Sequence, residues 1–343
     1  MSKILVTGGC GYIGSHTVID LLNNGFEVVS ADNFMRSLPD ALDNIYKVTG
    51  QRVTNYNIDL CDRSALEQVF ATEGDISGVI HFAALKSVPE SVAEPLFYFR
   101  NNLESLINLL EICEKYKVGK FVFSSSCSVY GNATQLPVTE DTPFMEAESP
   151  YARTKQISEK IISDLSRISK GKFVVLRYFN PVGAHESGLI GENPKDGAVF
   201  NIFPRITGVA IGRYDHLDVF GDDYDTRDGT CIRDYIHVMD IAHAHTLALQ
   251  YMSGNELAPR YDIFNLGTGT GVTVMEVVRA FERVSGMKLR YEMKPRRAGD
   301  VEAIYADNEK ATQRLGWKIE RDLDTMISTA WAWEQQLARQ QKV

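Results

Sequence analysis

Glycines near the amino terminus constrain the fold of this chain more than any other feature. The apolar run 4–7 suits a buried parallel strand, and a helix-like run follows at 12–23. Between and within these runs lie the glycines Gly8, Gly9, Gly11 and Gly14. Glycine permits a tight turn and lets the backbone approach a pyrophosphate, and the N–H groups at a helix start offset phosphate charge. Strand, glycine turn and helix together predict a dinucleotide-binding loop, with an ordinary glycine-rich turn as the alternative.

A carboxylate follows the second predicted strand and bears on the choice of dinucleotide. Asn24-Gly25 suits a left-handed helix cap, and the run 26–31 then predicts a strand that ends at Asp32. A carboxylate at this distance accepts hydrogen bonds from ribose hydroxyls and repels a 2′-phosphate, which favours NAD over NADP. Arg36 is the one neighbour that could favour NADP, and we interpret it as a loop residue.

Composition limits the class of protein. The 343 residues suffice for two domains, and 44% hydrophobic with 24% charged residues is typical of a globular protein. The net charge of −9 disfavours nucleic acid or an anionic membrane as a partner. We expect a cytoplasmic protein, because no secretory signal precedes the first strand and no apolar run approaches about 18 residues. The scattered, odd-numbered cysteines fit a reducing compartment and predict no bound metal.

Strand-like and helix-like runs alternate as far as about residue 180. The predicted strands are 4–7, 26–31, 53–58, 76–82, 119–125 and 172–179. This alternation predicts an α/β fold, a Rossmann-type doubly wound parallel sheet covered on both faces. After residue 180 the pattern breaks into shorter elements and loops rich in glycine and aspartate, which predicts a smaller C-terminal α/β substrate lobe. We therefore expect an NAD-binding domain at 1–180, with a return segment near 235–266, and the substrate lobe at 181–343.

Two long helices are predicted at 91–116 and 151–169, on either side of the fifth strand. Their surplus apolar positions could pair with a second subunit, although burial in the core explains them almost as well. We expect a homodimer.

A tyrosine and a lysine four residues apart predict the chemistry. Tyr151 and Lys155 begin the helix at 151–169, so their side chains share a face. A free tyrosine has a pKa near 10, and a nearby ammonium with a positive nicotinamide ring is expected to lower it toward the working range. Tyr116 and Lys120 repeat the spacing, but they flank a helix-to-strand turn where the side chains need not converge.

Serines end the fifth predicted strand, at the edge where a doubly wound sheet binds its ligands. Ser124, Ser125 and Ser126 offer hydroxyls that can bind a sugar oxygen while Tyr151 removes its proton. Serines at a strand end are more often simple turn formers. The tyrosine and lysine further along favour the catalytic interpretation.

Longer motifs then resemble a known family along nearly the whole chain. They read VTGGCGYIGSHT, HFAALKSVPESV, FSSSCSVYGN, SPYARTK, LRYFNPVGAH, DGTCIRDYIHVMD, FNLGTGTG and PRRAGD. The chain resembles the extended short-chain dehydrogenase/reductase superfamily and, within it, the UDP-glucose 4-epimerases.

The resemblance implies the site residues. The catalytic positions would be Ser126, Tyr151 and Lys155. The NAD contacts would be Gly8, Gly11, Tyr12, Ile13, Gly14, Asp32, Asn33, Asp59, Leu60, Phe82, Ala83, Lys86, Asn101, Tyr151, Lys155 and Tyr178. The UDP-sugar contacts would be Lys86, Ser126, Tyr151, Asn180, Asn201, Ile202, Arg233, Tyr235, Arg297, Asp300 and Ile304. Arginines suit a diphosphate. Without the resemblance, Arg233 beside Asp234 would be interpreted as a local ion pair, and Arg296 beside Arg297 as a solvated surface pair.

The implied activity is NAD-dependent inversion at C4 of a UDP-hexose through a 4-keto intermediate. Alternatives on the same scaffold are a dehydratase, a decarboxylating enzyme, a dehydrogenase and a non-catalytic NAD-sensing module. A dehydratase would carry an Asp-Glu pair where this chain has Cys127-Ser128, and a sensing module tends to lack the tyrosine or lysine.

Ile304 falls where the family places a gate beside the sugar 2-substituent, with Tyr305 next to it. Because isoleucine is smaller than tyrosine, we expect some turnover of UDP-GlcNAc and UDP-GalNAc, although Ile304 could equally be a buried strand residue.

Overall fold

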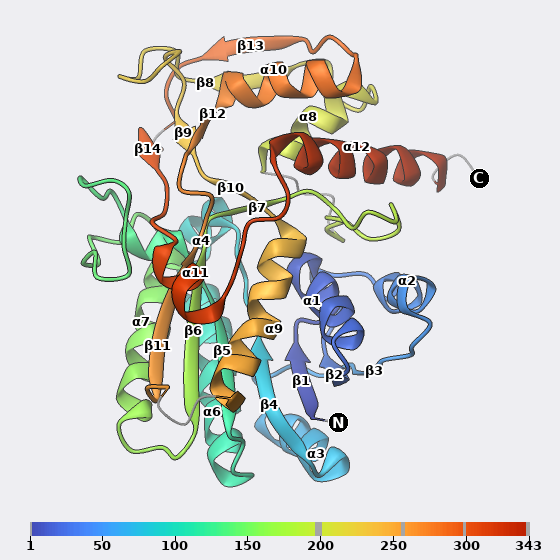
Figure 1. Cartoon of the computed structure of the whole chain (residues 1–343), viewed down its shortest axis with the longest axis vertical. Helices are drawn as coiled ribbons and strands as arrows, with labels where there is room; N and C mark the ends of the chain where they lie inside the picture. Colours follow the sequence, from blue (N-terminus) through green and yellow to red (C-terminus); the bar gives the residue numbers. More distant parts are fainter. Residues whose placement is uncertain (1, 196–200, 255–257, 298–299, 341–343) are drawn as a thin grey trace.

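A parallel sheet forms the centre of the protein (Figure 1). The structure is a computed structural model that describes residues 2–195, 201–254, 258–297 and 300–340. The sheet has 7 strands in the order β11-β6-β5-β4-β1-β2-β3. These strands are β1 Lys3–Thr7, β2 Glu27–Ala31, β3 Thr54–Tyr56, β4 Ile76–His81, β5 Lys120–Ser126, β6 Lys172–Tyr178 and β11 Tyr261–Leu266. The order and the parallel pairing confirm the Rossmann-type α/β fold predicted from the sequence.

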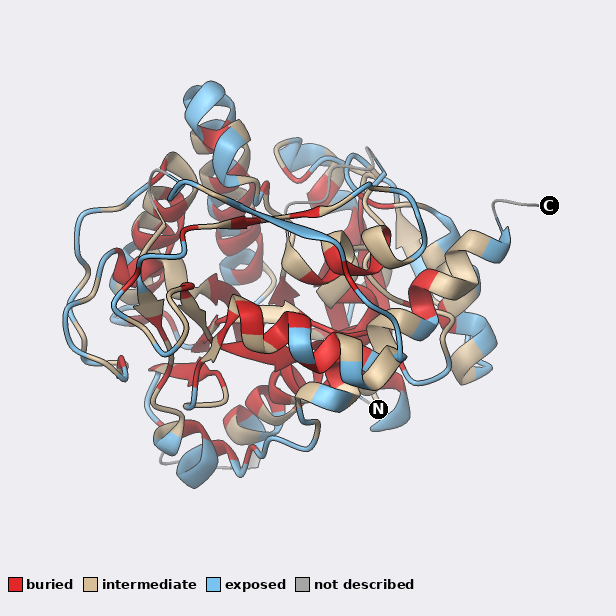
Figure 2. Ribbon diagram, turned by 90° about the horizontal axis from the view of Figure 1, so that it is seen from above, coloured by how far each residue is buried: buried red, intermediate tan, exposed pale blue. Residues whose placement is uncertain are grey.

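Helices cover both faces of this sheet, as the strand sequences require. Ile4 and Val6 of β1 belong to one buried cluster and Leu5 to another, because alternate residues of a strand point to opposite faces. The first face carries α1 Tyr12–Asn23, α2 Asp40–Thr49 and α9 Val238–Gly254, and the second carries α3 Arg63–Glu73, α6 Ser105–Lys115 and α7 Pro150–Ser166. Figure 2 shows the buried residues concentrated in the sheet and in the helix faces toward it.

A second group of elements lies beyond the carboxyl ends of the sheet strands (Figure 1). Its helices are α8 Ile202–Ala210, α10 Val274–Ser285 and α12 Leu323–Gln340, and they share a separate buried cluster. Its short strands are β7 Asn180–Val182, β8 Leu217–Phe220, β9 Ile232–Arg233, β10 Tyr235–His237, β12 Val272–Thr273, β13 Tyr291–Lys294 and β14 Ala303–Ile304. This group is the smaller C-terminal α/β lobe expected from the sequence.

The chain passes back and forth between the sheet and the lobe. After β10 it returns to the sheet as α9 and β11, and it then leaves for β12 and α10. After β14 it returns once more as α11 Glu309–Leu315, which packs against α9 and β11, before α12 closes the lobe. The two groups of elements are therefore interleaved in sequence.

The order of the strands defines where a ligand can bind. From β1 the chain builds outward through β2 and β3 on one side and through β4, β5 and β6 on the other. A crevice forms at such a reversal, outside the carboxyl ends of the strands. The glycine loop follows β1 at this point, and the segment Phe82–Lys86 follows β4 beside it.

The predicted long helix at 91–116 is wrong in detail. The structure divides this segment into α4 Val88–Ala93, α5 Pro95–Phe99, the π-helical turn η1 Arg100–Glu104 and α6. Pro95 is the reason for the break after α4, because proline has no N–H to continue a helix and fits only its first turn. The second predicted helix is present as α7. Within the described residues, no helix is both long enough and apolar enough to cross a membrane.

Candidate active site

The glycine loop is shaped by close contacts that no other residue permits. Gly8 has φ +71°, and a Cβ there would lie 2.9 Å from the backbone nitrogen of Ala83. A Cβ on Gly14 would lie 2.1 Å from the Gly8 carbonyl oxygen. The start of α1 is thus drawn against the end of β1 and the segment after β4. The N–H groups of Gly8, Cys10 and Gly11 donate within the protein, so the N–H groups at the start of α1 are the ones that can face a pyrophosphate. The loop fits the dinucleotide predicted for it.

Asp32 directly follows β2, at the predicted place, and its carboxylate already accepts hydrogen bonds within the protein. It accepts hydrogen bonds from the backbone nitrogens of Cys10 at 3.0 Å and Phe34 at 2.9 Å, and from the Ser37 hydroxyl at 2.7 Å. A carboxylate has about four acceptor positions, so about one remains for a ribose hydroxyl. The carboxylate therefore also fixes the loop on which an adenosine ribose would rest.

The remaining predicted cofactor residues lie around the same crevice. Asn33, Asp59 and Leu60 follow β2 and β3, Phe82, Ala83 and Lys86 follow β4, Asn101 lies in η1 and Tyr178 ends β6. Two of the predicted residues already have partners in the C-terminal lobe. The Tyr12 hydroxyl donates to the Gly183 carbonyl at 2.6 Å, and Lys86 Nζ lies 3.1 Å from Glu192 Oε1. Neither contact was predicted from the sequence.

The predicted catalytic residues come together at the carboxyl end of β5. Ser126 is the last residue of β5, and Tyr151 and Lys155 lie in the first turns of α7, which Ser149 caps. Lys155 is buried, and its Nζ donates to the Ser124 carbonyl at 2.8 Å while lying 4.7 Å from the Phe123 ring centre. Burial lowers the pKa of Lys155 to about 8, and the Glu159 carboxylate opposes this effect.

The pKa of Tyr151 differs from the sequence-based expectation. Burial raises the pKa of Tyr151 to about 12, and a hydrogen bond with Ser126 partly offsets that rise. Lys155 is not among the groups that lower it. The phenol is therefore protonated at neutral pH in this state, and lowering its pKa requires a further positive charge.

A buried polar network lies directly behind these residues. Arg177 binds Glu159 through two nitrogens, with the shorter contact at 2.6 Å, and donates to the Tyr130 hydroxyl at 2.9 Å. The Ser125 hydroxyl donates to Glu159 at 2.5 Å. Ser125 precedes Ser126, Arg177 precedes Tyr178, and Glu159 lies one turn after Lys155. The network therefore holds β5, β6 and α7 in one arrangement, and sequence reasoning missed it.

Charged side chains gather where the lobe faces the sheet. The Asp300 carboxylate lies between Arg297, at 2.9 Å and 3.1 Å, and Arg233, at 3.5 Å. Arg233 is further held by donation to the Ile232 and Val301 carbonyls at 2.8 Å each. Two guanidiniums around one carboxylate leave a net positive charge, which suits an anionic ligand.

Asp234 organises this region and was not predicted as a site residue. Its fully buried carboxylate accepts from the backbone nitrogens of Thr268, Gly269 and Ala306 at 2.7 Å, 3.2 Å and 3.0 Å, and from the Thr268 hydroxyl at 2.6 Å. It thereby joins the β9–β10 connection to the turn after β11 and to the residues after β14. The adjacent charges Arg233 and Asp234 have separate roles and do not form the local ion pair considered from the sequence.

Other predicted substrate residues occupy different environments. Asn180 lies in β7, and Asn201 precedes α8 and donates to Glu192 at 3.2 Å, with Ile202 following it. Tyr235 is buried, with its ring centre 5.5 Å from that of Phe203. Ile304 is also buried and packs with Val129, Val138 and Phe179.

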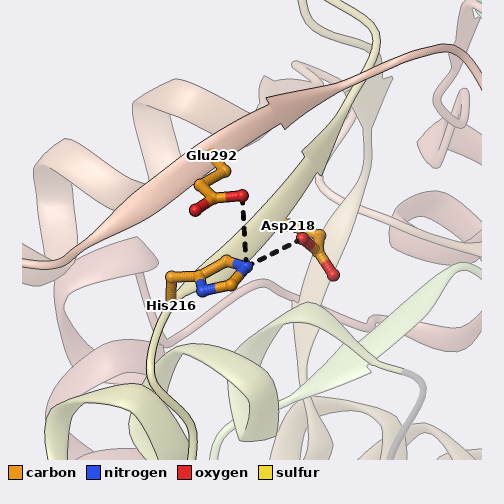
Figure 3. A group of neighbouring side chains, drawn as sticks. All are labelled: His216, Asp218 and Glu292. Carbon is orange, nitrogen blue, oxygen red and sulfur yellow. Dashed lines mark ion pairs between the residues drawn. The ribbon is translucent and has the colours of Figure 1, made fainter.

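A cluster of possible metal ligands lies on the outer strands of the lobe (Figure 3). His216 Nε2 is 3.3 Å from Asp218 Oδ1 and 3.4 Å from Glu292 Oε2. The ammonium of Lys294 lies 2.6 Å from the same Glu292 oxygen. The cluster thus already has a cation, and we interpret it as a network of surface ion pairs.

Comparison with known proteins agrees with this geometry. The GDP-mannose 4,6 dehydratase family profile matches residues 5–330. The UDP-glucose 4-epimerase of Bacillus subtilis is 49% identical, over 96% of each chain. The crystal structure of the Bifidobacterium longum UDP-glucose 4-epimerase with NAD+ and UDP has a TM-score of 0.92 and 46% identity, over 98% of each chain. The Stenotrophomonas maltophila enzyme, solved with NAD and formylated UDP-arabinopyranose, has a TM-score of 0.95 and 42% identity, over 99% of this chain and 100% of that one.

The fold and the Tyr151–Lys155–Ser126 cluster define an extended short-chain dehydrogenase/reductase. Within that superfamily, the similarity extends over nearly the full length of both chains and includes the lobe as well as the sheet. The chain belongs to the UDP-glucose 4-epimerase family.

Proposed function

We propose that this protein inverts C4 of a UDP-hexose, interconverting UDP-glucose and UDP-galactose with NAD as its cofactor. The observation that supports it most directly is the meeting of Tyr151, Lys155 and Ser126 at the crevice between the glycine loop and the charged face of the lobe. NAD, when bound, supplies the acceptor and then the donor of the C4 hydride. The other tasks, which are proton transfer, orientation and nucleotide binding, belong to side chains of the protein.

In this proposal Tyr151 exchanges the proton of the sugar 4-hydroxyl. Ser126 binds the same sugar oxygen and orients it. The positive nicotinamide ring, when NAD is bound, would supply the further charge that stabilises the phenolate, together with the Lys155 ammonium. Because the two faces of C4 must each meet the cofactor, the hexose has to turn over while the nucleotide stays bound. The two arginines beside Asp300 serve that anchoring role, since they can bind a diphosphate without contacting the sugar ring.

Four UDP-sugars, assayed separately with catalytic NAD, test this function. An epimerase converts UDP-glucose and UDP-galactose into each other while no bulk NADH accumulates. A dehydrogenase would release NADH in proportion to product, and a dehydratase would release water and leave a 4-keto product. Accumulation of either NADH or a 4-keto sugar, or absence of any turnover, would overturn the proposal.

The gate residue determines the proposed breadth of substrate. Ile304 is smaller than tyrosine, and we propose slow turnover of UDP-GlcNAc and UDP-GalNAc. Its burial leaves little of the side chain facing the crevice, so the test compares kcat/KM for both substrate pairs before and after Ile304→Tyr. A ratio that falls about 10-fold or more against the N-acetylated pair supports the gate. An unchanged ratio, with Ile304→Leu as the matched control, removes Ile304 from the site.

A homodimer is proposed through the face formed by α4, α5 and α6. Val92, Leu96, Phe97 and Ile107 are exposed there, and Leu96 retains 81% of its accessible surface. A cluster of exposed apolar side chains on neighbouring helices is typical of a subunit interface. Leu96→Lys should shift the mass in solution from dimer to monomer, and a monomeric wild-type protein would refute the interface.

The same proposal assigns a ligand to each part of the chain. Residues 1–180, with the return segment near 235–266, would hold NAD, and 181–343 would hold the UDP-sugar. The five free thiols fit a reducing compartment, and a cytoplasmic location remains our prediction.

A further inference from the structure

Tyr224 carries a buried hydroxyl without a partner, close to the charged face of the lobe. The residue is 6% exposed, and its hydroxyl oxygen has no hydrogen-bond partner among the residues that the structure describes. A buried polar group nearly always has a hydrogen-bond partner in a folded protein, and a buried group without a partner lowers the stability of the folded protein. A hydroxyl kept in this condition therefore calls for a partner outside the chain.

The ring of Tyr224 is held firmly in its position. Its backbone nitrogen donates to the Gly229 carbonyl at 3.0 Å, which closes the loop between β8 and β9. The guanidinium of Arg296 lies 4.0 Å above the ring, and Arg296 is itself bound to Asp223 at 2.7 Å. A Cβ on Gly221 would lie 2.3 Å from the ring, so the glycine makes room for it. These contacts fix the direction of the hydroxyl, which cannot turn away to find water.

The surroundings of the hydroxyl are those of the proposed nucleotide site. Asp300, Cys231, Arg296 and Arg233 are the charged or ionisable groups close enough to act on the phenol. Burial raises the pKa of Tyr224, with Asp300 adding to the rise, so the hydroxyl keeps its proton and can donate it. Arg233 and Asp300 are the residues that we assign to the UDP part of the substrate.

We propose that Tyr224 is a further binding residue of the UDP-sugar site, whose hydroxyl donates a hydrogen bond to an oxygen of the ribose or diphosphate. This inference rests on the proposed function and extends it, since neither the motifs nor the resemblance assigned a role to Tyr224. The hydroxyl gains its partner only when nucleotide is bound, so the bond contributes to affinity and not to the stability of the free enzyme.

Tyr224→Phe separates these two contributions. The variant removes only the oxygen, so the ring keeps its contacts with Arg296 and Gly221. We expect the Kd for UDP, measured by calorimetry on the NAD-loaded enzyme, to rise about 5- to 100-fold. The Tm of the free variant should equal or exceed that of the wild type, because an unpaired buried hydroxyl has been removed.

Tyr251→Phe is the matched control and should show the opposite pattern. The Tyr251 hydroxyl donates to Asp262 at 2.9 Å and accepts from Arg314 at 2.6 Å, near the amino-terminal end of β11 and away from the crevice. Its loss should lower Tm and leave the Kd for UDP unchanged. An unchanged Kd in Tyr224→Phe, or a fall in Tm as large as that of Tyr251→Phe, would overturn the inference. If wild-type enzyme itself failed to bind UDP, the proposed function and not the role of Tyr224 would be at fault.

Discussion

Two polar clusters of this protein contrast in how completely they are satisfied. Behind the proposed catalytic residues, Arg177 and Ser125 both donate to the Glu159 carboxylate, and all three residues are almost fully buried. At the lobe, Arg233 and Arg297 share one carboxylate, and most of the Arg297 side chain is exposed. In the first cluster the charged groups are paired with one another, whereas the second cluster has more positive than negative charge and can bind an anion.

This contrast matches the different requirements of proton transfer and of nucleotide binding. Proton transfer needs fixed distances between a base and its substrate, and a saturated buried network holds those distances. Nucleotide binding needs donors that the ligand can use, so the donors must be incompletely paired beforehand. Variants on each side should therefore fail in different measurements.

The largest effect is expected for Tyr151→Phe. Removing the hydroxyl removes the proposed general base, so kcat should fall about 10²- to 10⁴-fold while UDP affinity and NAD content stay unchanged. Initial rates of epimerisation and calorimetric UDP binding measure the two quantities. Tyr116→Phe, in the other pair with this spacing, is the control and should keep most of its kcat. Substantial activity in Tyr151→Phe would remove Tyr151 as the base.

Arg177→Met tests the saturated cluster through stability. It leaves the Glu159 carboxylate buried without its cation, and we expect the free energy of unfolding to fall by about 3–5 kcal/mol in urea titrations. Glu159→Leu combined with Arg177→Met removes both charges and should recover most of that loss. If the double variant is as unstable as the single one, pairing of the two charges is not how the network stabilises the protein. The double variant should still lose kcat, because β5, β6 and α7 are no longer tied together.

The ionisation of Tyr151 should depend on bound NAD. Without ligand its pKa is about 12, and Lys155, with a pKa of about 8, loses its charge before the phenol ionises. A positive nicotinamide ring favours the phenolate, so its absorbance should appear at a pH lower by about 1–3 in the NAD-loaded enzyme. The titration is read as the difference between the wild type and Tyr151→Phe. Coincident curves with and without NAD would contradict this account of activation.

Arg233→Met should have a smaller effect, confined to the lobe. Loss of one guanidinium should raise the Kd for UDP about 10- to 100-fold and leave kcat within a few fold. Arg283→Met is the control, because Arg283 pairs with Asp324 on the exposed surface and should not affect Kd. A fall in kcat with an unchanged Kd for UDP would show that Arg233 acts in catalysis and not in nucleotide binding.

The sequence was most informative where local pattern determines local structure. The glycine loop, the position of Asp32 directly after β2 and the helix face shared by Tyr151 and Lys155 each depend on residues a few positions apart. The break at Pro95 was missed, because the apolar pattern on both sides of the proline was interpreted as one continuous helix.

Contacts between distant segments could not be predicted in the same way. Asp234 joins residues near 268 and 306, and Glu159 pairs with Arg177 on another element, so no spacing in the sequence reveals either. From the sequence alone, Asp234 would be expected at the surface, as most charged residues are. Only its burial and its hydrogen bonds show that it joins three segments of the lobe. The position of Tyr224 likewise depends on the loop that Gly229 closes and on Arg296, which follows β13.

The alternation of the chain between sheet and lobe limits how this enzyme can be re-engineered. Because α9, β11 and α11 return to the sheet between segments of the lobe, no single junction within the described parts of the chain separates the sheet from the lobe. A chimera with a new sugar-nucleotide specificity would need several segments exchanged together. Recombination at one junction near residue 180 should instead yield proteins whose returning helices do not match the sheet they must cover.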